Sequence, residues 1–172
     1  MSIHTLGNPQ KSGAYVLELR LQYDLELTFG RFQNGRSFLL RRGWLYYVGS
    51  ALAGRLPSRL LRHASRAAGP PHALREGLLN YFRELGWRVK PPHKKTLHWH
   101  ADYLMESAAE LAAVHVFFGD RPMEAQLEAA LRALGAAPLA PGLGAGDRPG
   151  GSHVLWSPTR PPSEKISARS PS

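Results

Sequence analysis

The chain has 172 residues, of which 43% are hydrophobic, which is enough for one domain with a core and excludes a wholly disordered chain. It carries no cysteine, which excludes a disulfide framework and a thiolate metal site. No apolar run approaches the roughly 18 residues of a membrane span, and the first residues lack a basic-then-apolar export signal. We therefore expect a cytoplasmic protein without a membrane partner.

The net charge of +9 is concentrated in the middle of the chain. Residues 55–100 contain ten Lys and Arg against two Asp and Glu, a net charge of +8, whereas residues 101–172 contain six against eight. Such a block is typical of phosphate contacts, although a solvated basic face would give the same count. We therefore expect DNA as a partner. The candidate contacts are Arg55, Arg62, Arg66, Lys90, Lys94 and Lys95.

The first part of the chain shows the alternation of apolar and polar residues that is typical of strands. Residues 13–23 predict a half-buried strand, and a turn at Asn34-Gly35 separates further short strand patterns. Together these patterns predict an antiparallel meander over the first 50 residues. The expected strands lie at 13–23, 25–32, 38–40 and 44–48.

Helical spacing dominates the remainder of the chain. Ser58 is the expected N-cap of a helix that reaches His63. Further helices are expected at 73–86, 97–104 and 122–134, with short strands at 113–118 and 152–156. These elements predict an α+β fold with a small mixed or antiparallel sheet flanked by helices. We expect an N-terminal extension at 1–12, a domain at 13–156, and a disordered tail at 157–172 that is rich in Pro, Ser and isolated charges.

Three polar side chains are expected to converge where the strand at 44–48 ends. Arg59 and His63 are four residues apart and share one helix face, and this face lies above the end of the strand that carries Tyr47. None of the three would stabilise a core better than leucine. Their convergence indicates a site for an anionic ligand.

These motifs resemble the signature of the GIY-YIG nuclease superfamily. Its first half is similar to Gly13-Ala14-Tyr15, its second half to Tyr47-Val48-Gly49, and its helix position to Arg59 with His63. Within the superfamily, the chain looks most like the small Uri-type (DUF123-like) group of archaea and bacteria, which is sometimes attached to endonuclease III-like DNA glycosylases. The marks of this group are Tyr47-Val48-Gly49-Ser50-Ala51, Arg62-His63, His98-Trp99-His100-Ala101-Asp102-Tyr103-Leu104 and Ser152-His153-Val154-Leu155.

The resemblance implies a GIY-YIG-like fold and a metal-dependent DNA endonuclease that acts in repair on particular DNA structures or lesions. It implies catalytic roles for Tyr15, Tyr47, Arg59 and His63, in which either phenol activates or positions the attacking water. A phenol, with an ordinary pKa near 10, would need a lower pKa to act as a base, and Arg59 is expected to lower it. An endonuclease III-like glycosylase is implied as a further partner.

The metal ligand implied by the resemblance is one glutamate on a late helix. Glu124 is the better match, and Glu128, one turn further on, is the competitor. A single carboxylate with water suits Mg²⁺ or Mn²⁺, since magnesium keeps most of its hydration. No small-molecule cofactor is implied.

Several features depart from the family pattern and leave alternatives open. Residues 67–92 are expected to be an insertion, Ser50 stands where some members carry lysine, and Arg148 and Gly150 stand where the family usually has cysteines. A nucleic-acid-binding module without turnover is therefore a second hypothesis. A third is a zinc hydrolase, because His98, His100 and Asp102 form a His-x-His-x-Asp pattern. The alternative for these three residues is a supporting role beside the site.

Overall fold

Strands β2 (Gly13–Leu21) and β5 (Gly43–Ala51) pair antiparallel along their whole length at the centre of a sheet, in the computed structural model that describes residues 2–144 and 151–168. Within these residues the sheet has six strands in the order β1-β6-β2-β5-β8-β7. Strand β1 is parallel to β6, and the other pairs are antiparallel. The outer strands are β1 (Ser2–Leu6), β6 (Glu110–Phe118), β7 (Ala137–Pro138) and β8 (Val154–Ser157).

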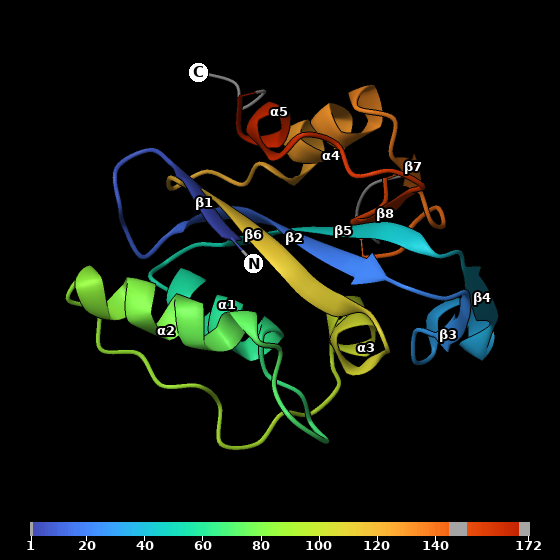
Figure 1. The fold of residues 1–172 in the computed structure, drawn as a ribbon, viewed down its shortest axis with the longest axis horizontal. Coiled ribbons are helices and arrows are strands. Elements are labelled where there is room, and N and C mark those ends of the chain that lie inside the picture. The colour runs from blue at the N-terminus through green and yellow to red at the C-terminus, as the bar shows by residue number, and fades with distance from the viewer. Residues whose placement is uncertain (1, 145–150, 169–172) are drawn as a thin grey trace.

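Helices cover both faces of this sheet (Figure 1). One face carries α1 (Leu56–His63), α2 (Leu74–Glu84) and α3 (His100–Glu106), and the other carries α4 (Glu124–Ala133) and α5 (Ser163–Ala168). The α+β class expected from the sequence is confirmed. None of the helices in the described part of the chain is long and apolar enough to cross a membrane.

Strand β2 shows how the sequence builds two cores at once. Its alternate residues Tyr15 and Leu17 face the cluster under α1–α3, whereas Ala14 and Val16 face the cluster under α4 and α5. The alternation had predicted a half-buried strand. The structure instead buries β2 on both faces. Even Glu18 has no exposed surface. This arrangement fixes which side chains of β2 and β5 can reach the face beneath α1.

The connection between β2 and β5 differs from the predicted meander. Strands β3 (Leu25–Thr28) and β4 (Ser37–Leu40) pair with each other in a separate two-stranded sheet, with the 3₁₀ helix η1 (Phe32–Gly35) between them. The main sheet has no place for them, because Leu21 of β2 already pairs with Gly43 of β5. Periodicity identified the strand type of these segments but carries no information about their pairing partner.

Both ends of the chain are more ordered than the sequence predicted. Residues 2–6 form β1 and pair with β6, so the expected N-terminal extension contributes a strand. In the expected disordered tail, α5 packs against the sheet through Ile166, which is 1% exposed, and residues 169–172 lie outside the described part. A single buried apolar residue is too weak a signal to outweigh the polar composition around it.

Helix α1 begins earlier than expected. It starts at Leu56, with Pro57 in its first turn, where the missing N–H of proline costs no hydrogen bond. Ser58 is therefore inside the helix rather than its N-cap, and its hydroxyl donates to the carbonyl of Arg55. The shift leaves Arg59 and His63 on the same face, because their spacing is unchanged.

Candidate functional site

Tyr15, Tyr47 and His63 meet beneath α1. Tyr15 and Tyr47 project from the same face of neighbouring strands, with ring centroids 6.4 Å apart. The Tyr15 hydroxyl and His63 Nε2 share a hydrogen bond of 2.9 Å, and the ring centroids of Tyr47 and His63 lie 5.7 Å apart. Gly49 makes room for this pair, because a Cβ there would lie 2.6 Å from the Tyr15 hydroxyl oxygen. The tyrosines and histidine predicted from sequence are therefore brought together.

Burial sets the protonation states of these groups. Tyr15 is fully buried, and burial raises its pKa well above the ordinary value, with the Tyr47 neighbour adding to the shift and Arg59 opposing it. Burial also raises the pKa of Tyr47 to about 12, again against the opposing effect of Arg59. Arg59 lowers both tyrosine pKa values, as expected, but burial outweighs this effect and the net pKa of each phenol is raised. Both phenols are protonated at neutral pH.

His63 is neutral for the same reason. Its side chain has no exposed surface, and burial lowers its pKa to about 3, with Asp102 opposing and the cations Lys95, Arg59 and Arg62 adding to the decrease. Its Nδ1 atom has no hydrogen-bond partner within the described residues. A neutral imidazole next to Tyr15 can accept or donate one proton without first changing its charge.

Arg59 lies at the wall of an open groove on the outer side of α1. Its guanidinium carbon is 4.2 Å from the centroid of the Trp99 ring, and Arg59 makes no ion pair within residues 2–144 and 151–168. The groove encloses ≈ 380 Å³. Its lining residues are Arg55, Ser58, Arg59, Arg62, Lys90, Pro92 and Trp99. The groove therefore presents guanidinium and ammonium groups beside an aromatic ring, which suits a phosphate-bearing ligand.

A buried ion-pair network centred on Asp102 lies next to this groove. Asp102 has no exposed surface, and its Oδ2 accepts from the backbone N–H groups of His98 and Trp99 and from Arg62 at 2.8 Å. Burial alone would raise the Asp102 pKa, but these hydrogen bonds and the Arg62 charge hold it below the ordinary value. Asp102 therefore fixes the start of α3 and orients Arg62.

The other predicted DNA contacts divide between surface and interior. Arg55, Lys90 and Lys94 are exposed, and the first two line the groove. Lys95 is only 5% exposed, and its Nζ donates to the carbonyl of Ser65 and lies 3.3 Å from Glu106. A nucleic acid at the surface cannot reach it, so its predicted role as a DNA contact is wrong.

Arg66 is also used inside the protein. It donates to the carbonyls of Met105 and Ala109 and pairs with Glu110 at 3.1 Å. These bonds tie the end of α1 to α3 and β6. Arg66 was predicted to contact DNA, but its side chain is held in this structural network and does not line the groove.

Glu124 and Glu128 occupy different environments on α4. Glu128 is buried, pairs with Arg132 at 2.7 Å and accepts from the backbone N–H of Ser152. Glu124 is half-buried, makes no ion pair within the described residues, and raises the pKa of both Tyr15 and Tyr47 by its charge. Of the two carboxylates, Glu124 is therefore the one available beside the tyrosines.

Ser50 anchors the beginning of α4. Its hydroxyl accepts from the backbone N–H of Met123 at 3.4 Å, immediately before Glu124. This hydrogen bond links the end of β5 to the helix that carries the candidate metal ligand. Arg148 and Gly150, the other departures noted in the sequence, lie outside the described residues.

His98, His100 and Asp102 do not converge on one point. The exposed His98 ring lies against Trp99, and His100 contacts the rings of Phe29 and Phe32. The described residues contain no group of three or more His, Cys, Asp or Glu side chains arranged to hold a metal ion. The zinc hypothesis therefore has no support in the geometry. Asp102 supports the site through Arg62, with His98 contributing only its backbone N–H.

Neither Trp99 nor His153 was given a role in the site on sequence grounds. Trp99 lies under the guanidinium groups of both Arg59 and Arg62, at 4.2 and 4.9 Å. The His153 ring centroid is 6.4 Å from that of Tyr47. Both residues belong to motifs singled out in the sequence, so the motifs themselves were the available signal.

Comparison with known proteins identifies the family. A family model described as a domain of unknown function, DUF123, matches residues 14–170. No curated protein and no solved structure matches the chain. Because the match covers most of the sequence, the chain belongs to the DUF123 family, which is associated with a GIY-YIG-like fold.

Proposed function

We propose that this protein is a metal-dependent endonuclease that hydrolyses phosphodiester bonds in DNA, with branched or damaged DNA in repair as its substrate. The single observation that carries the proposal is the arrangement of Tyr15, Tyr47 and His63 next to an arginine that has no ion pair in the described structure. The similarity of the motifs to the GIY-YIG nuclease superfamily points in the same direction. An endonuclease III-like glycosylase is a proposed partner on that similarity alone.

The two tyrosines take different roles in this proposal. Tyr47 is 9% exposed and Tyr15 is fully buried, so Tyr47 is the phenol that a water molecule at the surface can approach. Its raised pKa makes it a hydrogen-bonding group that positions the water rather than a pre-formed phenolate. Tyr15 and the neutral His63 form the buried pair behind it, and a pKa of about 3 makes His63 a hydrogen-bonding partner of Tyr15 rather than a base at neutral pH.

Arg59 supplies the positive charge that phosphodiester cleavage needs. A guanidinium beside the scissile phosphate donates hydrogen bonds to oxygens whose charge increases in the transition state. Because Arg59 rests on the Trp99 ring, its position is set before a ligand binds. The exposed Arg55 and Lys90 line the same groove and would contact neighbouring phosphates.

The chemistry of Glu124 fits a hard divalent ion. It is a half-buried carboxylate without an ion-pair partner in the described residues, and Mg²⁺ is commonly held by one or two carboxylates together with water and substrate oxygens. Glu124 would hold the ion, which when bound would stabilise the charge on the leaving oxygen. Tyr47 would position the water and Arg59 would stabilise the developing charge, while Tyr15 and His63 would hold Tyr47 from behind.

The test is a cleavage assay on single-stranded, duplex, branched and abasic DNA, with Mg²⁺, Mn²⁺ or EDTA. We expect cleavage that EDTA abolishes. Glu124→Gln should lose cleavage and regain only part of it at high Mg²⁺. Glu128→Gln is the matched control, because Glu128 is held by Arg132 and Ser152, so its loss should reduce stability while cleavage by the folded fraction persists. Metal-independent cleavage, or equal activity in both variants, would refute the assignment of Glu124.

One observation favours the second hypothesis, a nucleic-acid-binding module without turnover. Both tyrosine pKa values are raised, so neither phenol is a ready base at neutral pH. Binding of DNA in the groove with no cleavage of any substrate under any metal condition would establish the module. Cleavage of any one substrate that depends on Arg59 would exclude it.

A further inference from the structure

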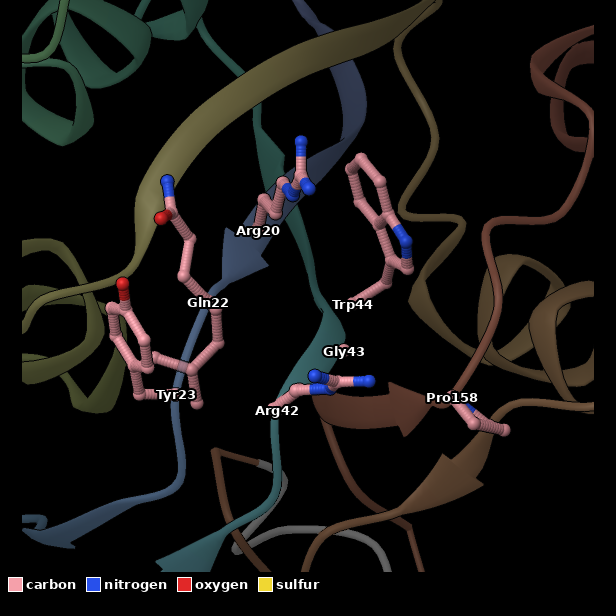
Figure 2. A pocket seen from close by; sticks show the side chains of 8 residues that line it. Arg20, Gln22, Tyr23, Arg42, Gly43, Trp44 and Pro158 are labelled. Atoms are coloured by element: carbon pink, nitrogen blue, oxygen red, sulfur yellow. The ribbon is translucent and has the colours of Figure 1, made fainter.

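A second pocket lies at the beginning of β5, whereas Tyr47 is in the middle of this strand. It encloses ≈ 360 Å³ and is lined by residues from the end of β2, the beginning of β5 and the chain after β8. Figure 2 shows Arg20 and Trp44 side by side on β2 and β5, with Tyr23 and Arg42 from the adjoining loops. Trp44 and Tyr47 are three residues apart, about 10 Å along the strand, and project from opposite faces. The pocket is therefore separate from the candidate site.

Two arginines of this pocket are not neutralised by an ion pair in the described part of the chain. Neither Arg20 nor Arg42 forms an ion pair within the described residues, and both side chains are exposed. The neighbouring charges are already matched, since Arg41 pairs with Asp24 at 2.9 Å and Arg160 pairs with Glu18. The pocket therefore carries a net positive charge that an anionic ligand can neutralise.

The aromatic ring of the pocket is held in place from below. Arg160 is bound to the fully buried Glu18, and its guanidinium carbon lies 4.9 Å from the centroid of the Trp44 ring. Arg20 lies 6.0 Å from the same centroid. Such cation–π contacts fix the orientation of the ring. Trp44 is thus a rigid surface between two guanidinium groups.

A second ring, that of Tyr23, stands in solvent. Tyr23 is 76% exposed and makes no aromatic contact within the described residues. A tyrosine ring left in water beside an uncompensated arginine offers a flat face for stacking and a charge for a phosphate. This combination is found where proteins bind single strands, since unpaired bases expose their faces and duplex bases do not.

We propose that this pocket binds a single-stranded segment of nucleic acid, with phosphates on Arg20 and Arg42 and a base stacked on Tyr23. The binding of a single strand here does not depend on the proposed function. Only the further statement that this strand is part of the branched or damaged substrate rests on it. Because Tyr47 and Trp44 face opposite sides of the sheet, one straight duplex does not reach both. A substrate with an unpaired arm does, since the arm can turn round the edge of the sheet.

The test measures binding of a fluorescein-labelled mixed-sequence oligonucleotide by anisotropy in EDTA, as a single strand and as its duplex. The double variant R20Q/R42Q should lower the slope of log K against log salt for the single strand by about 1.4, that is, about 0.7 for each contact. Tyr23→Ala should weaken binding of the single strand at least about fivefold and leave binding of the duplex unchanged. All three side chains are exposed, and circular dichroism would verify the folding of each variant.

The matched control is R31Q/R83Q, which removes the same charge from two exposed arginines outside both pockets. If R20Q/R42Q and the control bind the single strand equally, the proposal is overturned. Equal losses for single strand and duplex would also overturn it, because they indicate a plain phosphate patch. If the protein cleaves branched DNA but these variants bind DNA normally, the endonuclease assignment is supported and the single-strand site is refuted. If the expected binding changes are seen but no DNA is cleaved, the single-strand site is supported and the endonuclease assignment is refuted.

Discussion

The groove beside α1 and the network around Asp102 are built from the same basic stretch of sequence but use its charges in opposite ways. In the groove, Arg59 faces a tryptophan ring and no carboxylate within the described residues. One turn away, Arg62 is bound to a carboxylate with no exposed surface. Lys95 lies in the same interior network, within 3.8 Å of Asp102 and 3.3 Å of Glu106.

The difference teaches that the net charge of a segment is not the charge that a ligand meets. Residues 55–100 carry +8, but carboxylates from α3 and β6 neutralise Arg62, Arg66 and Lys95 inside the fold. The positive field of the groove therefore depends on a few side chains, and the interior pairs serve to hold α1 against α3. The predictions below treat the two regions separately.

The largest effect is expected from removal of Asp102. Asp102→Ala would leave Arg62 and the buried Lys95 without their shared carboxylate and would remove the acceptor for two backbone N–H groups. Loss of one partner from a buried pair typically costs about 3–5 kcal/mol. We expect a loss of this size in the free energy of unfolding measured by urea denaturation.

The control for this prediction is Asp24→Ala, which breaks the exposed pair with Arg41. Exposed pairs contribute little, because water screens the charges and both side chains lose conformational freedom. The urea midpoint of this variant should stay close to that of the wild type. A midpoint for Asp102→Ala that is equally unchanged would show that the network does not hold the domain together.

The next effect is catalytic and belongs to the groove. Arg59→Ala should lower kcat by about 10²–10³, the usual cost of one lost donor to a transition-state oxyanion. DNA binding should change by only a few fold, because Arg55 and Lys90 remain in the groove. Single-turnover cleavage and anisotropy measure the two quantities, and Arg83→Ala serves as an exposed-arginine control. Near wild-type cleavage by Arg59→Ala would place the catalytic centre elsewhere.

Sequence alone identified most residues of the candidate site but not the network. The family resemblance singled out Tyr15 and Tyr47, which the structure places on one face of the sheet, and a spacing of four put Arg59 and His63 on one face of a helix. The pair of Arg62 with Asp102 joins residues 40 positions apart, and no periodicity encodes such a contact. The strand pattern made burial of the tyrosines foreseeable. It could not show that burial would raise the tyrosine pKa by more than the arginine lowers it.

A third prediction concerns His63, which lies between the two regions. Its pKa is lowered to about 3, mainly by burial, so below pH 6.5 the unfolded chain takes up a proton that the folded protein does not. Stability should therefore fall as the pH decreases from 6.5 towards 3, by about 1.4 kcal/mol per pH unit from this group. His63→Gln should lack this contribution in urea titrations.

The pKa values of His4, His72 and His100 are also lowered, mainly by burial, so the difference between variant and wild type is the quantity to measure. The exposed His93 provides the control, and His93→Gln should keep the wild-type slope between pH 6.5 and 4.5. An unchanged slope in His63→Gln would mean that this imidazole is accessible to protons in the folded state. The neutral hydrogen-bonding partner of Tyr15 proposed here would then be partly charged below pH 6.5.

The smallest effect is the salt dependence of DNA binding, and it separates the two regions directly. The double variant R55Q/K90Q removes two exposed charges from the groove. If both contact phosphates, the slope of log K against log salt for duplex DNA should become less steep by about 1.8.

Lys95→Gln removes a charge from the same stretch of sequence, but this charge is buried against Ser65 and Glu106. Its folded fraction should keep the wild-type slope while its stability decreases. If the slope changes in Lys95→Gln and not in R55Q/K90Q, the roles of the two regions are reversed. The interior network would then open to the nucleic acid, and the groove would not contact it.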